Sequence, residues 1–163
     1  MSLKRRSVRV RLRRGSTLRG RIHIPEGQSL TEFLGSKLFF LNLTEVLWEA
    51  GGEKPLPHLS VRLSQVTWVE PLDPALSLSS ARPPAEEERR VELHVGGFTK
   101  LHVQLKVARE TRMSDYLDAN PSFIPLWAVR VPGEVTVVDR VALNHDAIEA
   151  VRELGDEEPG PGP

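Results

Sequence analysis

The chain has 163 residues, contains no cysteine and balances 22 Lys and Arg against 22 Asp and Glu. The absence of cysteine excludes disulfides, thiolate nucleophiles and cysteine-ligated zinc, and it is typical of a reducing compartment. No apolar run approaches the roughly 20 residues that a membrane span needs, and no apolar segment follows the basic N-terminus, so we expect a cytoplasmic protein without a signal sequence.

Positive charge is concentrated at the start of the chain. Residues 1–25 contain nine Lys and Arg and no Asp or Glu, which leaves 13 basic and 22 acidic residues in the remainder. Charge segregated in this way favours an anionic partner for the N-terminal part, either an acidic surface or the acidic remainder of another copy.

The first predicted elements form a hairpin. Residues 8–12 and 18–24 alternate apolar and polar side chains with a period of two, which is typical of half-buried strands. Gly15 lies between the two segments, where a turn needs a flexible residue. The sequence therefore predicts an antiparallel pair of strands at this end of the chain.

A short helix and further strands follow. The capping-box pattern Ser29-x-x-Glu32 predicts a helical turn, and Gly35 can end it. The apolar run 39–43 is too short for a helix, and the segment 60–70 is rich in β-branched residues. Both segments are predicted to be strands.

The chain then repeats itself. Residue n resembles residue n + 83 between positions 8 and 46, and the offset becomes 82 near the end. The repeat predicts two tandem units, 7–70 and 91–154, each a mainly β barrel or roll of about five short strands with one short helix. A Pro-, Ser- and Glu-rich linker is predicted at 71–90, and a disordered tail at 155–163.

Residues 145–154 admit two interpretations. Apolar side chains between 143 and 154 share one helical face, whereas the repeat pairs "IEAV" (148–151) with "VTWV" (66–69) and so predicts a strand. We expect the strand.

The order of motifs in the second unit carries a resemblance. "RMSDYL" (112–117), "SFIPL" (122–126) and "VALN" (141–144) stand in an order that resembles an uncharacterised bacterial family of small β domains with a "RLSDFLN…FIPL…VAVN" pattern. The first unit departs from this pattern, with Asn42 in place of proline. It is also loosely similar to Sm-type RNA-binding barrels. The resemblance implies small β modules in tandem and no catalytic residue.

Basic side chains dominate the outward face of the first hairpin: Arg9, Arg11, Arg13, Arg19, Arg21 and His23. Matching the apolar faces across the turn places Arg11 opposite Arg19 and Arg9 opposite Arg21. Directly opposed like charges cost roughly 0.2–1 kcal/mol per pair. The second unit has Glu92 at one of these outward positions, so the scaffold does not require arginine there.

Guanidinium groups in a row are suited to carboxylate or phosphate. The sequence therefore predicts a non-enzymatic interaction or assembly module that binds an acidic protein or another copy of itself. The alternative is nucleic-acid binding through the same face, which we rank lower because the basic residues are not interleaved with aromatic ones. A plain solvated strand surface stays open as a third interpretation.

No constellation in the sequence predicts catalysis. His94 and His102 are expected to lie opposite each other, but no third ligand stands at a suitable spacing for zinc. No glycine-rich phosphate loop is present. We therefore expect no catalytic residue, no metal and no cofactor. Trp127 follows a strand leucine and is the predicted aromatic contact residue.

Overall fold

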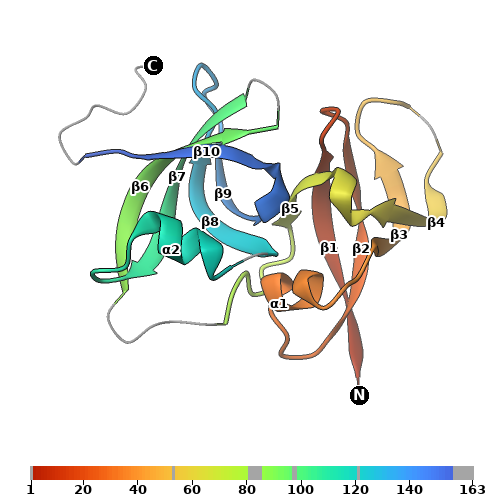
Figure 1. Ribbon diagram of the computed structural model, residues 1–163. Helices are drawn as coiled ribbons and strands as arrows, with labels where there is room; N and C mark the ends of the chain where they lie inside the picture. Colours follow the sequence, from red (N-terminus) through yellow and green to blue (C-terminus); the bar gives the residue numbers. More distant parts are fainter. Residues whose placement is uncertain (1, 53, 81–85, 97–98, 121, 156–163) are drawn as a thin grey trace. The chain divides into compact units, whose positions relative to one another are not determined.

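The computed structural model describes residues 2–52, 54–80, 86–96, 99–120 and 122–155 (Figure 1). The chain is mainly β, with antiparallel strands and two short helices in its described part. Contacts between residues divide it into two compact units, 1–80 and 81–163. Most of the predicted disordered tail, from residue 156 onward, lies outside the described residues.

The described residues of unit 1 form five strands, one α-helix and one 3-10 turn. In chain order these are β1 (Leu3–Leu12), β2 (Thr17–Pro25), α1 (Leu30–Gly35), β3 (Phe40–Trp48), β4 (Leu56–Arg62), η1 (Leu63–Gln65) and β5 (Val66–Pro71). The strands are hydrogen-bonded in the antiparallel order β5-β1-β2-β3-β4.

Unit 2 repeats this order of elements. They are β6 (Glu86–Val95), β7 (Thr99–Ala108), α2 (Met113–Asp118), β8 (Phe123–Arg130), β9 (Val137–Asn144), η2 (His145–Ala147) and β10 (Ile148–Glu153). Their antiparallel order is β10-β6-β7-β8-β9, which corresponds strand by strand to that of unit 1.

Of the expected barrel or roll, the strand order does not support a closed barrel. In unit 1 the series runs from β5 to β4, and a barrel would require those two strands to pair. Among the described residues, β4 is instead hydrogen-bonded to β3 on one side and continues through η1 into β5, which pairs with β1. The sheets are therefore open.

Alternation along the strands builds the cores, as the sequence predicts. In β1 and β2 the fully buried side chains Val8, Val10, Leu18 and Ile22 occupy one face. Leu93, Leu101, Leu105 and Ile124 do the same in unit 2. Full burial of such a side chain stabilises the fold by about 1.5–3 kcal/mol.

The two units share their irregularities as well as their strands. The β2–β3 ladder pairs Arg19 with Leu47 and Arg21 with Thr44, so β3 carries an extra residue. The β7–β8 ladder has the same step between its pairs His102–Arg130 and Gln104–Trp127, each displaced by 83 residues. A non-glycine residue with positive φ lies in each bulge: Glu45 (φ 52°) and Ala128 (φ 50°).

The capping-box prediction is confirmed at α1. The Ser29 hydroxyl accepts a hydrogen bond from the Glu32 backbone N–H (3.4 Å) and donates one to the Glu32 carboxylate (2.9 Å). The expected strand at 148–151 is also confirmed, because only His145–Ala147 form a helical turn before β10 begins.

Parts of the predicted linker at 71–90 lie in strands or are hydrogen-bonded to α1. Leu76 and Leu78 are buried, and backbone bonds from Leu30 N–H to Ser77 C=O and from Thr31 N–H to Leu78 C=O (2.8 and 3.1 Å) tie this segment to α1. At the other end, β6 begins at Glu86. No helix in the described ranges is long and apolar enough to span a membrane.

Candidate functional site

The β1–β2 hairpin brings the predicted arginines together in a different register. Arg9 lies opposite Arg19, whereas Arg11 lies opposite Thr17 and Arg21 opposite Ser7. The predicted pairs Arg11–Arg19 and Arg9–Arg21 are therefore wrong by two residues. A two-residue slip leaves every apolar side chain on its face, so alternation alone could not detect it.

Glutamates from β5 and from the end of β3 hold the centre of this face. The Arg9 guanidinium donates to Glu49 (2.7 Å) and to Glu70 (2.9 and 3.2 Å). The hydrogen bond to Glu49 is the largest cause that raises the pKa of Arg9. Glu49 also lies 3.7 Å from the Arg19 guanidinium, so one carboxylate bridges the two opposed arginines and relieves their repulsion.

The remaining predicted residues lie in different surroundings. Arg21 pairs with the bulge residue Glu45 (2.9 Å). Arg11 stacks on the Trp68 ring, 5.1 Å from its centroid, and His23 Nε2 lies 3.1 Å from the Thr44 hydroxyl. Arg13 is exposed beyond the end of β1.

We call the outward side of the unit 1 strands the outer face. Its charged residues are Arg5, Arg9, Arg11, Arg13, Arg19, Arg21, Arg62, Glu45, Glu49 and Glu70. Seven arginines against three glutamates leave a formal charge of +4. The sequence analysis missed these glutamates because they come from segments that are distant along the chain from the hairpin.

An apolar segment borders the outer face where β3 begins. Leu38, Phe39 and Phe40 are 85%, 64% and 43% exposed, and the Arg62 guanidinium lies 4.8 Å from the Phe40 ring centroid. In unit 2 the position equivalent to Phe40 is Phe123, which is only 8% exposed. This exposed apolar segment is a feature of unit 1, and the sequence analysis did not identify it.

Unit 2 carries the inverse charge arrangement at the equivalent positions. Glu92 occupies the place of Arg9, and its carboxylate accepts hydrogen bonds from His94 (2.9 Å), His102 (3.1 Å) and Arg152 (3.3 Å). Arg152 occupies the place of Glu70, since Arg9 pairs with Glu70 in β5 and Glu92 with Arg152 in β10. The hydrogen bond from His94, followed by that from Arg152, lowers the pKa of Glu92 to about 2.

Trp127, the predicted contact aromatic, is half-buried in β8. The Lys106 ammonium lies 4.4 Å from its ring centroid, which is a cation–π distance. The equivalent pair in unit 1 is His23 and Thr44, which are hydrogen-bonded. One face of the Trp127 ring is therefore occupied within unit 2.

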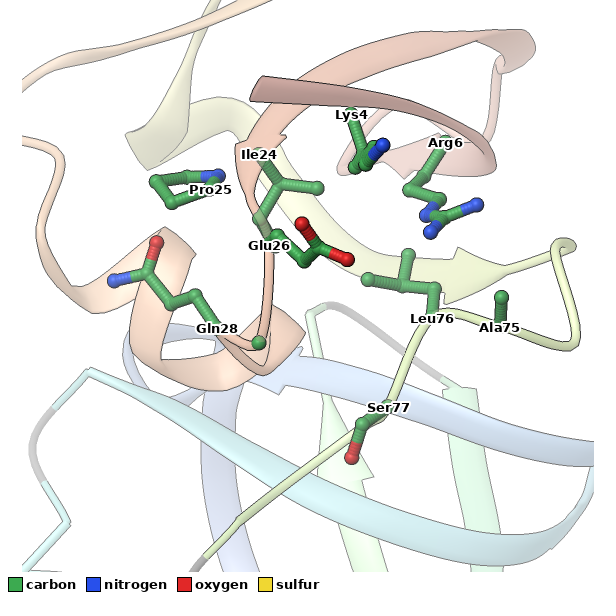
Figure 2. Close-up of a pocket in the computed structure, with 10 residues that line it drawn as sticks. Lys4, Arg6, Ile24, Pro25, Glu26, Gln28, Ala75, Leu76 and Ser77 are labelled. Carbon is green, nitrogen blue, oxygen red and sulfur yellow. The ribbon is translucent and has the colours of Figure 1, made fainter. Parts of the chain in front are cut away.

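A small pocket of about 80 Å³ lies in unit 1 between the β1–β2 hairpin and the segment after β5. Figure 2 shows its lining side chains, with those of Lys4 and Arg6 coming from β1 and that of Leu76 from the later segment. The Arg6 guanidinium is 3.3 Å from the Asp73 carboxylate, and Glu26 lies among the lining residues, so the pocket has no uncompensated cationic character.

No group of three metal-ligating side chains that could hold a metal ion occurs in the described residues. Comparison of the chain with protein-family models, with curated proteins and with solved structures finds no match. The geometry of the chain itself therefore carries the functional argument.

Proposed function

We propose that the chain is a non-enzymatic protein-interaction module whose outer face in unit 1 binds an acidic protein surface. The observation that carries this proposal is the +4 formal charge that persists on the outer face after its internal ion pairs are counted. Arg5 and Arg13 are exposed and make no side-chain ion pair with any described residue.

The surroundings of the outer face favour protein over nucleic acid. Glu45, Glu49 and Glu70 are interspersed among the arginines, where they would lie close to a phosphate backbone and repel it. The adjacent Leu38 and Phe39 offer the exposed apolar contacts that are common at the centres of protein interfaces. Nucleic acid, the alternative, is an outcome of the test below.

A second copy of the chain is one acidic partner of suitable charge. Unit 1 contains 12 Lys and Arg and 7 Asp and Glu, whereas unit 2 contains 10 and 15. Their formal charges are thus +5 and −5. Opposite charges steer association and make it dependent on salt.

We further propose that the two units are tandem copies of one ancestral β module, in which the curled sheet rather than a closed barrel is the repeated form. The equal order of elements, the matching bulges and the positive φ of Glu45 and Ala128 support this proposal. Bulges are typically retained within families.

The test measures binding of a fluorescent acidic peptide and of a single-stranded oligonucleotide of equal charge to the full chain, with light scattering of the chain alone. We expect the peptide to bind more tightly than the oligonucleotide at low salt. The charge-reversed variant Arg13→Glu/Arg19→Glu should lose at least tenfold in peptide affinity, because it lowers the formal charge of the outer face from +4 to 0.

The matched control is Arg109→Glu/Arg112→Glu, which changes the net charge equally at two exposed positions of unit 2. Equal losses in both variants would show that only net charge matters and would overturn the assignment to the outer face. Tighter binding of the oligonucleotide would establish the alternative. If light scattering gives a mass above that of one chain, and only the outer-face variant returns to the mass of one chain, the partner is a second copy.

A further inference from the structure

A second pocket lies on the outward side of unit 2, and it is distinct from the outer face of unit 1. Its volume is about 300 Å³, at the lower end of the range for small-molecule sites. Four strands and the residue after β10 line it: Arg90, His102, Val103, Gln104, Ala128, Arg130, Val137 and Leu154.

The β7–β8 bulge lies at this pocket. Between the pairs His102–Arg130 and Gln104–Trp127, β8 contains one residue more than β7, which displaces the two strands locally from regular pairing. Ala128, the residue with positive φ, fills the bulge with a single methyl group. A larger side chain there would occupy part of the space.

Two arginines reach the pocket from either side of β7, Arg90 from β6 and Arg130 from β8. Neither guanidinium has an ion pair or hydrogen bond with any residue in the described part of the chain. Arg89 and Arg152 of the same unit form ion pairs, with Glu87 and Glu92, whereas the exposed Arg109 and Arg112 form none with a described residue. Arg90 and Arg130 differ from Arg109 and Arg112 in that both line the same pocket.

The lining contains no carboxylate, and the Gln104 amide can donate hydrogen bonds as well as the two guanidinium groups. His102 directs Nε2 to the Glu92 carboxylate, whose oxygens can only accept, so that nitrogen carries a proton. Its Nδ1 is buried and has no hydrogen-bond partner among the described residues; when the single proton of the ring is on Nε2, Nδ1 is an acceptor, so it adds no donor for an anion.

Unit 1 provides an internal comparison. The positions equivalent to Arg90 and Arg130 are Ser7 and Leu47, and the bulge residue there is Glu45 instead of Ala128. The scaffold therefore requires neither the arginine pair nor the small bulge residue. Both occur together in unit 2, where the pocket lies.

We propose that this pocket of unit 2 binds the phosphoryl group of a small phosphate monoester. Two guanidinium groups on separate strands can donate to a tetrahedral dianion from two sides, whereas one guanidinium suffices for a planar carboxylate. Val137 and Leu154 supply apolar surface for the organic part of the ligand. The site is independent of the proposed protein-binding surface, because all its residues belong to unit 2.

The test is an NMR titration of the uniformly ¹⁵N-labelled full chain with phenyl phosphate, inorganic phosphate and benzoate at constant ionic strength. We expect saturable shifts in β6, β7 and β8, with phenyl phosphate binding most tightly. Arg90→Gln and Arg130→Gln should each weaken phenyl phosphate binding at least tenfold. The control Arg112→Gln removes an exposed arginine of unit 2 that does not line the pocket, and it should change the affinity less than twofold.

Several results would overturn the proposal. Benzoate binding as tightly as phenyl phosphate would exclude a phosphoryl-specific site, and equal binding of inorganic phosphate would show that Val137 and Leu154 contribute nothing. Shifts distributed equally over the arginines of unit 1 would show non-specific attraction. The amide spectra report whether each variant is folded, and Arg130→Lys, which keeps the charge, should retain more affinity than Arg130→Gln.

Discussion

Replacing Glu92 with glutamine removes the carboxylate on which His94, His102 and Arg152 converge. These hydrogen bonds lower the pKa of Glu92 from its usual 4.5 to about 2. A fall of that size corresponds to at most about 3.4 kcal/mol, since one pKa unit is worth about 1.36 kcal/mol. Two partners are well exposed, His94 at 39% and Arg152 at 56%, so solvent screens the interaction. We therefore expect Glu92→Gln to lower the free energy of unfolding of unit 2 by about 1–2 kcal/mol at pH 7.

The pH dependence of this loss has a definite sign. Because the pKa of Glu92 is lower in the folded than in the unfolded state, its contribution is fully present above pH 4.5 and is lost as the pH falls toward 2. The difference in unfolding free energy between the parent and Glu92→Gln should therefore narrow between pH 5 and pH 2.

Urea titrations measure this difference. Trp48 and Trp68 are replaced by phenylalanine in every variant, so that the fluorescence of Trp127 reports on unit 2 alone. Glu88→Gln, an exposed glutamate of the same strand, is the matched control and should stay within about 0.5 kcal/mol of the parent. The reasoning is refuted if the two variants are equally stable, or if the loss in Glu92→Gln is the same at pH 7 and pH 2.

Two further substitutions test the packing and capping of unit 1. Gly20→Ala places a Cβ 3.3 Å from both the Leu43 Cβ and the Thr44 carbonyl oxygen, so we expect the free energy of unfolding, measured with urea, to fall by about 1–3 kcal/mol. An unchanged urea midpoint would show that β3 can move aside without cost. Ser29→Ala removes the N-cap of α1 and should cost about 0.5–2 kcal/mol, while Ser64→Ala, at an exposed position, should cost little; equal effects would contradict the capping role.

Much of the secondary structure could be predicted from the sequence, because alternation, the capping box and the internal offset each reflect a local rule. The buried residues of β1 and β2 and the ends of α1 follow from them. The N-terminal limit of β1 could not be predicted in this way, because Lys4 and Arg6 occupy inward positions at which apolar residues would have indicated a strand. The prolines and serines of 71–80 similarly predicted a linker, so the burial of Leu76 and Leu78 was not expected.

The candidate sites were harder to predict from the sequence. Alternation assigns each side chain to a face, but the backbone bonds of the turn set the register, through Gly15 N–H to Leu12 C=O and Leu12 N–H to Ser16 C=O (both 2.9 Å). The carboxylates that pair with Arg9 come from β5 and the end of β3, and their proximity depends on pairing over 40 residues or more of chain. The pocket of unit 2 depends on the β7–β8 bulge, which no local sequence motif predicts.

The ion pairs Arg9–Glu70 and Glu92–Arg152 carry opposite charges at equivalent positions of the two units. This exchange limits how such a surface can change in evolution. Exchanging a single member would set two like charges side by side, so we expect a chain with only one replacement to be less stable than one with either complete pair. The effect of each substitution should therefore depend on the residue at the partner position, which is epistasis between the two sites. Among relatives, charge at the two positions of each pair should therefore covary, whereas the buried aliphatic positions should vary independently of them.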